Sequence, residues 1–338
     1  MYRKTPVGGR AAIRRRAVLG LVLAAAAVLH ADGVRAEWVK REAAILGTAV
    51  TVELWHDDRA AADRAADAVL AEMRRVDALM STYKPESVLS VVNARAAAEP
   101  VAVPAELAGL IALSLEYSQR TEGAFDITYA SVGYLYDYRA GVKPEDEVLA
   151  EALPAVNWRH VHLDQDKGTV RFAQPGVRID LGGIAKGHAV DRAIDLLRER
   201  GVEHALVTAG GDTRLLGDRR GAPWMVGVRD PRVEGRVFLR LPMEDEAIST
   251  SGDYERYFEA DGQRYHHILE PGSGKPASSV YSVTVIGPQA VDTDALSTSV
   301  FVLGVERGLA LIERLEAFEA VIVDARGAVH YSSGLTAP

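Results

Sequence analysis

The clearest pattern of hydrophobic and polar positions runs from residue 177 to residue 211. Residues 177–181 alternate between apolar and polar side chains and predict a short strand, which a glycine pair ends. From residue 188 apolar residues recur at helical spacing until Gly201, a residue favoured just past the end of a helix. Residues 204–208 predict a second strand. The order strand, glycine turn, helix and strand predicts a βαβ unit with parallel strands.

The same two periodicities, helical and alternating, organise the rest of the chain. Amphipathic helices are predicted at residues 58–80, 104–122, 292–303 and 306–315. Strands are predicted at residues 42–55, 224–228, 236–242, 281–287 and 320–324. A tyrosine-rich hairpin is expected between residues 252 and 265, and an exposed connection with a short helix at 138–154. Helices and strands interleave throughout, so the expected fold class is α/β, with mixed α+β character.

Residues 1–36 have the pattern of an export signal. Arg15 and Arg16 precede an apolar run, and Ala36 ends a small-residue cleavage motif. The arginine pair fits a twin-arginine signal, and the basic start of a general export signal fits equally well. We expect cleavage near Ala36, a mature domain of residues 37–338 and a periplasmic protein. An uncleaved membrane anchor is the alternative.

Composition and charge narrow the range of functions. The formal net charge is −8, and residues 1–36 carry +6, which leaves −14 on the remainder. This charge argues against a nucleic-acid partner. The chain has no cysteine, which excludes disulfides, a thiolate nucleophile and cysteine-ligated zinc. It also lacks the G-x-G-x-x-G pattern of nicotinamide enzymes and the G-x-S-x-G elbow of serine hydrolases.

Several polar side chains stand where ligands are often bound. Asp180 ends the predicted strand at 177–181, at the edge where α/β sheets bind ligands. Asp294, Ser297 and Thr298 share one helix face, and their oxygens suit Mg²⁺, although a helix cap would use the same residue types. Lys186 follows the glycine pair but lacks the Ser or Thr of a phosphate-binding loop, so we expect it to be solvated or to pair with an acid.

Two adjacent histidines, His266 and His267, lie near the end of the predicted hairpin. Neighbouring residues of a strand point to opposite faces, so at most one of the two serves a given site. A zinc site is poorly supported, because the chain has neither an H-E-x-x-H motif nor cysteines.

Taken together, these segments resemble the ApbE family, the FAD:protein FMN transferases. The resemblance extends from about residue 45 to residue 315. It rests on eight segments in the family's order: ILGTAV, MSTYKPESVLSVVN, GAFDITYASVG, IDLGGIAKGHAVDRA, LVTAGGD, ISTSGDYERYF, HHILEPGSGKP and DTDALSTSVFVLG. Each segment alone is a weak signal, and their joint occurrence is specific.

The resemblance implies an ApbE-like fold of two closely packed subdomains around a central cleft for FAD and Mg²⁺. The implied reaction splits FAD, transfers its FMN half to a Thr or Ser hydroxyl of an acceptor flavoprotein and releases AMP. The resemblance also implies a peripheral association of this protein with membrane redox complexes. The implied metal ligands are Gly183, Asp294 and Thr298, and the implied catalytic residues are His267 and Asp294. The implied FAD contacts are Leu46, Tyr83, Ala124, Phe125, Asp126, Asp180, Lys186 and Ile268.

The chain departs from the family's pattern at two positions. Glu270 replaces the Asp that is usual after the histidine motif, and a shift of about one ångström in a catalytic group can cost ~10²-fold in rate. Leu46 replaces a common Met, a change that conserves volume. Two alternatives to the transferase therefore stay open: a periplasmic FAD pyrophosphatase that uses water, and a non-catalytic FAD carrier.

Overall fold

A computed structural model describes residues 37–260 and 262–335. The predicted export signal lies outside the described residues. At the centre is an eight-stranded sheet in which every neighbouring pair of strands is antiparallel. In spatial order its strands are β1 (Glu37–Ile45), β2 (Thr48–His56), β6 (His204–Ala209), β7 (Asp212–Leu216), β10 (Ala247–Gly252), β13 (Val280–Gly287), β14 (Glu319–Asp324) and β15 (Val329–Tyr331).

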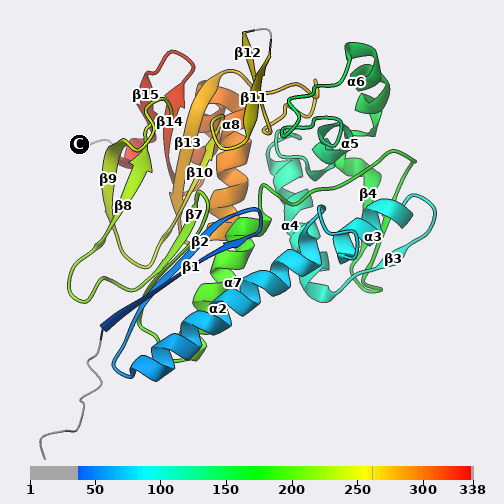
Figure 1. Cartoon of the computed structure of the whole chain (residues 1–338). Coiled ribbons are helices and arrows are strands. Elements are labelled where there is room, and N and C mark those ends of the chain that lie inside the picture. The colour runs from blue at the N-terminus through cyan, green and yellow to red at the C-terminus, as the bar shows by residue number, and fades with distance from the viewer. Residues whose placement is uncertain (1–36, 261, 336–338) are drawn as a thin grey trace, which may run out of the picture.

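Helices pack on one face of this sheet, and a β-hairpin packs on part of the other. Helices α2 (Arg59–Met80), α7 (Ala185–Glu199) and α8 (Ala290–Ile312) pack on one face, where the main core lies (Figure 1). A hairpin of β8 (Trp224–Arg229) and β9 (Val237–Met243) covers part of the other face through a smaller core around Trp224. Alternate side chains of β10 and β13 enter the two cores, as the period of a strand requires.

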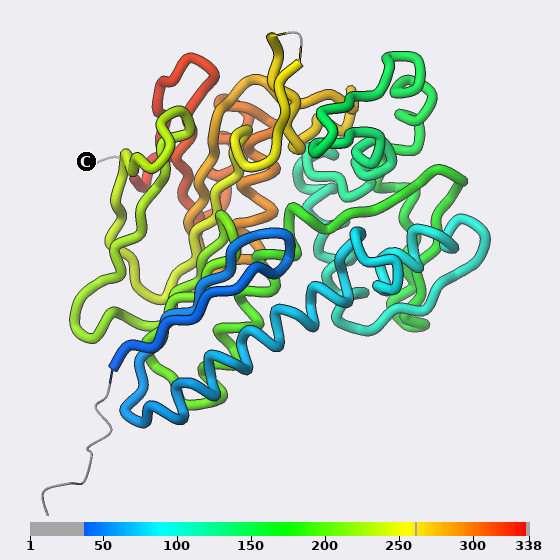
Figure 2. The backbone as a smooth tube through the Cα atoms, in the orientation of Figure 1, coloured from blue at the N-terminus to red at the C-terminus, as the bar shows by residue number. Residues whose placement is uncertain are grey.

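A smaller lobe is inserted between β2 and β6, and Figure 2 traces the chain through it. Its helices are α3 (Val88–Arg95), α4 (Ala105–Arg120), α5 (Ala130–Gly133) and α6 (Asp146–Ala152), with short 3₁₀ turns at Ile127–Tyr129, Leu153–Ala155 and Trp158–His160. Its three-stranded sheet has the order β3 (Val101–Ala102), β5 (Thr169–Phe172) and β4 (Val161–Asp164). A separate hairpin, β11 (Tyr257–Ala260) and β12 (Gln263–His266), rises from the large sheet, and the described chain ends in a 3₁₀ turn at Ser333–Leu335.

The predicted parallel βαβ unit is wrong, although its helix and its second strand exist. Residues 177–181 form no strand and belong to no sheet. Their backbone is bonded by other groups: Asn93 exchanges two hydrogen bonds with Ile179, and Ser131 Oγ accepts from the Arg178 N–H. Strand β6, which follows α7, pairs antiparallel with both β2 and β7. The alternating pattern arises because one side of the segment is buried, and such burial does not require a partner strand.

Most of the other predicted elements are confirmed, with corrections at their edges. The strand predicted at 42–55 is a hairpin of β1 and β2 whose turn places Leu46 and Gly47 at positive φ, 56° and 70°. The helices predicted at 292–303 and 306–315 form one element, α8, interrupted by Gly304 at φ 75°. Helix α3 and the small sheet were not predicted from the sequence.

Helix α8 is fixed by its neighbours. Gln289 supplies no side-chain cap, and the Asp191 carboxylate of α7 instead accepts hydrogen bonds from the Ala290 and Val291 N–H groups, at 2.9 and 2.8 Å. This satisfies two donors that a helix start leaves free.

Helix α8 is long and apolar enough to span a membrane, yet it packs on β10, β13 and α7, as a core helix does.

Candidate active site

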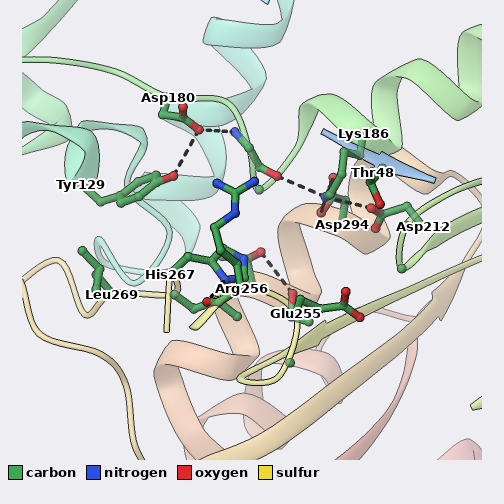
Figure 3. A pocket seen from close by; sticks show the side chains of 18 of the residues that line it. Thr48, Tyr129, Asp180, Lys186, Asp212, Glu255, Arg256, His267, Leu269 and Asp294 are labelled. Atoms are coloured by element: carbon green, nitrogen blue, oxygen red, sulfur yellow. Dashed lines mark hydrogen bonds and ion pairs between the residues drawn. The ribbon is translucent and has the colours of Figure 1, made fainter. Parts of the chain in front are cut away.

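A pocket lies between the large sheet and the smaller lobe (Figure 3). Two groups of segments form its walls. One is the smaller lobe with the turn before α7, and the other comprises the β1–β2 turn, β10, the foot of the β11–β12 hairpin and α8. The expectation of two packed subdomains around a central cleft is therefore confirmed. The lining residues used below are Leu46, Phe125, Asp126, Tyr129, Asp180, Gly183, Lys186, Asp212, Ser251, Glu255, Arg256, His267, Ile268, Leu269, Asp294 and Thr298.

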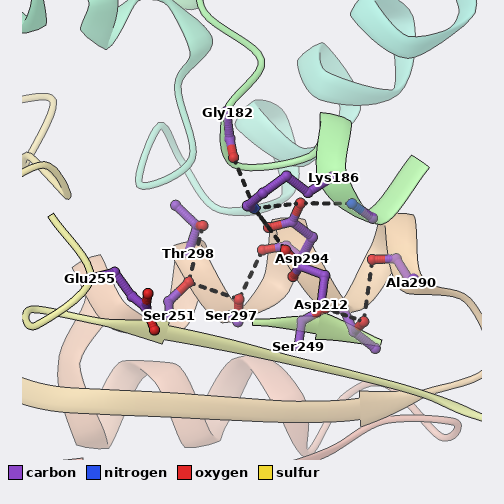
Figure 4. A network of polar contacts seen from close by, with 12 residues as sticks. Gly182, Lys186, Asp212, Ser249, Ser251, Glu255, Ala290, Asp294, Ser297 and Thr298 are labelled. Atoms are coloured by element: carbon purple, nitrogen blue, oxygen red, sulfur yellow. Dashed lines mark hydrogen bonds and ion pairs between the residues drawn. The ribbon is translucent and has the colours of Figure 1, made fainter. Parts of the chain in front are cut away.

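The floor of the pocket is an ion-pair cluster of two carboxylates and one ammonium group (Figure 4). Lys186 Nζ lies 2.8 Å from Asp212 Oδ2 and 3.1 Å from Asp294 Oδ1, and it also donates to the Gly182 carbonyl at 3.1 Å. The Gly187 N–H donates to Asp294 Oδ2 at 3.0 Å. The expected pairing of Lys186 with an acid is thus observed, and it uses two acids.

Burial sets the electrostatics of this cluster. It raises the pKa of Asp294 to about 7, and the nearby Asp212 carboxylate adds to the rise, while Lys186 opposes it. For Lys186, burial would lower the pKa, but the carboxylates of Asp212 and Asp294 outweigh it, so the pKa is raised and the group stays charged. The floor therefore already holds one positive charge among buried oxygens.

A row of hydroxyl groups extends from this cluster along β10 and α8. Ser251 Oγ lies 2.8 Å from Ser297 Oγ and 3.3 Å from Thr298 Oγ1. Gly183 approaches the same place so closely that a Cβ on it would lie 3.2 Å from Thr298 Oγ1. Asp294 and Thr298 come from one face of α8, one helical turn apart, as the sequence indicated. The structure therefore gathers Gly183, Asp294 and Thr298 into one pocket.

Asp180 lies on the opposite wall, held in place by three donors. Thr82 Oγ1 donates to one carboxylate oxygen at 2.8 Å, and the Gly182 N–H and the Tyr129 hydroxyl donate to the other at 2.7 and 3.1 Å. Burial and the Asp180 charge raise the pKa of Tyr129 well above its ordinary value, so its hydroxyl remains a donor. Asp180 thus lines the pocket from a loop and not from a strand end.

The two histidines separate as strand geometry requires. His266 is buried, and its Nε2 bonds to the Ala277 carbonyl at 2.7 Å, so it has a structural role. His267 lines the pocket, and its Nδ1 lies 3.3 Å from the Arg256 carbonyl. Burial and the Arg256 guanidinium lower the pKa of His267 to about 3, so the ring is neutral. A proton on Nδ1, shared with that carbonyl, leaves Nε2 as an acceptor.

The apolar wall is formed by Leu46, Phe125, Ile268 and Leu269. Leu46 is held at positive φ, a conformation that costs energy in a residue with a side chain and that is frequent at functional sites. Asp126 also lines the pocket, but its carboxylate accepts from the Thr128 and Trp158 N–H groups, at 2.8 and 2.9 Å. Burial raises the pKa of Asp126. Its main local role is to start the short helix at Ile127–Tyr129.

Two predicted FAD contacts are not part of this lining. Ala124 is half-buried beside it, and Tyr83 is 76% exposed on the connection between α2 and α3. Tyr83 is nevertheless tied to the pocket, because its hydroxyl accepts from Arg256 Nη1 at 2.8 Å.

Sequence reasoning missed several polar residues of the pocket, among them Asp212, Tyr129 and Arg256. Asp212 follows the Gly210–Gly211 turn between β6 and β7, and its glycine pair was the available signal. Tyr129 lies in the aromatic-rich stretch 123–138, and aromatic side chains in such a stretch usually serve packing. Arg256 lies in the matched segment ISTSGDYERYF, but nothing in that segment marks it as a site residue, and the folded loop before β11 brings it to the pocket.

The donor set fits a hard cation such as Mg²⁺. Among residues 37–260 and 262–335 no group of three or more His or acidic side chains forms a metal site by itself. Mg²⁺ is usually held by one or two carboxylates together with neutral oxygens and substrate phosphates, which matches Asp294, Thr298 and the Gly183 carbonyl. The Lys186 ammonium among the oxygens of Asp294, Asp212 and Gly182 shows that this place accommodates positive charge.

Fold and site together define a two-lobed α/β protein whose cleft combines an apolar wall with an acidic, oxygen-rich floor. The model of the ApbE family matches residues 46–322, and the chain belongs to this family. The expected family membership and fold class are confirmed.

Relatives and solved structures support the same assignment. The FAD:protein FMN transferase of Treponema pallidum is 35% identical over 311 residues, which are 86% of either chain. The ApbE protein of Thermotoga maritima superposes with a TM-score of 0.82 at 35% identity, over 88% of this chain and 98% of that one. The flavin transferase ApbE of Vibrio cholerae gives a TM-score of 0.78 at 30% identity, over the same shares.

Proposed function

We propose that this chain is an FAD:protein FMN transferase that depends on Mg²⁺. It splits the diphosphate of FAD, attaches the FMN half to a Ser or Thr hydroxyl of an acceptor flavoprotein, and releases AMP. The observation that carries the proposal is the convergence of His267, Asp294, Thr298 and Gly183 on one pocket with an apolar wall, in a chain of the ApbE family.

Each part of the pocket has a task in this reaction. The wall of Leu46, Phe125 and Ile268 would hold the flavin ring, an apolar and planar group. Asp180, fixed by its three donors, would accept hydrogen bonds from the bound cofactor. Asp294, Thr298 and the Gly183 carbonyl would hold Mg²⁺. A bound Mg²⁺ supplies charge neutralisation at a diphosphate and at its leaving group.

The chemical step needs positioning and one proton acceptor. The acceptor hydroxyl oxygen attacks the phosphorus of the FMN half, the bond from that phosphorus to the AMP oxygen breaks, and AMP leaves. The hydroxyl proton passes to His267 Nε2, which is left as an acceptor because Nδ1 faces the Arg256 carbonyl. Lys186 keeps Asp294 and Asp212 in place and limits their mutual repulsion.

The acceptor and the cellular setting are part of the same proposal. A signal of the kind carried by residues 1–36 would place the enzyme in the periplasm, where its acceptors would be exported or membrane-bound redox subunits. The acceptor would present a short segment containing Ser or Thr. The strongly negative charge of residues 37–338 fits a protein partner better than a nucleic acid.

AMP release separates this function from its two rivals. We expect AMP release from FAD and Mg²⁺ only when an acceptor domain is added, and loss of that release with EDTA or with Asp294→Ala. Equal AMP release with and without acceptor would indicate a pyrophosphatase. FAD binding without AMP release under either condition would indicate a carrier.

A further inference from the structure

Of the two cations that line the pocket, Arg256 is the one without an acidic partner among the described residues. In the described part of the chain, the charged groups that line the pocket are five carboxylates, of Asp126, Asp180, Asp212, Glu255 and Asp294, and the two cations Lys186 and Arg256. Lys186 is paired with Asp212 and Asp294, and Glu255 is paired with Arg229, which lies outside the pocket. Within residues 37–260 and 262–335, no carboxylate forms an ion pair with Arg256.

The position of Arg256 is set by its backbone and is close to the candidate base. Its carbonyl accepts from the His267 N–H at 3.2 Å and lies 3.3 Å from His267 Nδ1. Its side chain extends over the pocket, where Figure 3 shows the guanidinium between His267 and Asp180. The guanidinium meets Tyr83, donating to the hydroxyl at 2.8 Å and lying 5.7 Å from the ring centroid.

We propose that Arg256 is a phosphate-binding residue that holds the diphosphate of FAD next to His267. This inference rests on the proposed function, because it assumes that FAD is the substrate. A diphosphate entering the pocket meets an excess of carboxylates, and Lys186 is already neutralised by two of them. Arg256 is the cation that remains free to bind it, and a guanidinium forms two parallel hydrogen bonds with a phosphate.

The contact with Tyr83 is then a resting position for the side chain. It joins the guanidinium to one neutral hydroxyl on an exposed side chain, whereas a phosphate offers charged oxygens and two parallel hydrogen bonds, which are stronger. When FAD binds, the Arg256 guanidinium exchanges the Tyr83 hydroxyl for phosphate oxygens, and this exchange favours the FAD complex. In the competing explanation Arg256 does not bind phosphate. It acts only as a clasp, a residue that holds Tyr83, one of the implied FAD contacts, in place against the flavin ring.

Comparison of FAD with riboflavin distinguishes these two roles, because riboflavin has the same ring system and no phosphate. Dissociation constants are measured by flavin fluorescence for the wild type, Arg256→Met, Arg256→Lys and Tyr83→Phe. The control is Arg240→Met, which removes the same charge from an exposed position on β9, away from the pocket.

We expect Arg256→Met to weaken FAD binding by ~10- to 100-fold, the loss of one charge-assisted contact, and to leave riboflavin binding unchanged. Arg256→Lys should recover part of the affinity for FAD, and added salt should weaken FAD binding less in Arg256→Met than in the wild type. Arg240→Met should bind both ligands as the wild type does. Tyr83→Phe should keep the wild-type ratio of the two affinities.

Two results would overturn the proposal: equal losses for FAD and riboflavin in Arg256→Met, which is the behaviour of a clasp, or an unchanged affinity for FAD. The same proteins are assayed for transfer to an acceptor. If the wild type binds FAD through Arg256 but modifies no acceptor, the transferase function fails while the phosphate contact stands. If the wild type transfers FMN and Arg256→Met binds FAD equally well, only the role of Arg256 fails.

Discussion

Gly187 is the position where a single methyl group should disturb the site most. It lies in the first turn of α7, where this helix crosses the start of α8, and its N–H donates to Asp294 Oδ2 at 3.0 Å. A Cβ at this position would lie 2.1 Å from the Ala290 carbonyl oxygen and 2.8 Å from Val291 Cα. Both are backbone atoms, so no flexible side chain can give way.

The expected size of the effect follows from these distances. To reach ordinary contact, the two helices must separate by roughly an ångström, and overpacking of this kind costs ~1–3 kcal/mol of unfolding free energy. The gain in helix propensity from Gly to Ala, ~1 kcal/mol, offsets only part of this cost. The separation also moves Asp294 and Thr298 on α8 away from Lys186 on α7, and a displacement of that size can lower the rate ~10²-fold.

Urea unfolding and FMN transfer measure the two effects for Gly187→Ala. The control is Gly109→Ala in α4, where a Cβ meets no atom within 4 Å and a small gain in stability, ~0.5–1 kcal/mol, is expected. If Gly187→Ala matched the wild type in both midpoint and rate, the argument that this close approach positions Asp294 would be refuted.

Three further changes test separate parts of the account. His267→Ala should lower FMN transfer by ~10²- to 10⁴-fold and leave FAD binding intact in a fluorescence titration, and an unchanged rate would exclude His267 as proton acceptor. Glu270→Asp should change transfer by less than about threefold, because Glu270 lies outside the pocket lining and accepts from Ser273 Oγ; a larger change would give it a catalytic role. Glu106→Gln should cost ~1 kcal/mol of unfolding free energy at pH 7, because hydrogen bonds from Arg75, together with His188, lower the pKa of Glu106 to about 2. A lowered folded-state pKa stabilises the fold above the unfolded value and loses that effect as the pH falls, so the gap to the wild type in urea unfolding should narrow between pH 7 and pH 3.5; a constant gap would contradict this ion pair.

The sequence predicted secondary structure well where a segment has a single clear periodicity and where local residues set its ends. The helix predicted at 58–80 and α2 differ by a single residue, because Asp58 caps the helix start and Pro85 lies beyond its end. Sheet topology was harder, because alternation shows which side of a segment is buried but not what it packs on. Residues 177–180 alternate as a strand would, yet their backbone bonds to the side chains of Asn93 and Ser131.

In the candidate site, too, local patterns predicted some features, and others depend on contacts between distant segments. The helical spacing of Asp294 and Thr298 was enough to place them on one face, and the geometry of adjacent residues was enough to separate His266 from His267. Gly183 and Asp180 could be tied to that site only by the family resemblance. Asp212 and Arg256 depend on loops from different parts of the chain that meet at one pocket; the glycine pair before Asp212 predicts a turn but not what that turn faces.

Intact-mass spectrometry of an acceptor tests the central claim most directly. A protein of residues 37–338 is incubated with FAD, Mg²⁺ and an acceptor domain known to carry FMN through a phosphoester bond. The account predicts that the acceptor gains the mass of one FMN phosphoester with the wild type, and not with Asp294→Ala or after EDTA treatment. An acceptor of unchanged mass, with FAD intact or converted to free FMN and AMP, would contradict it.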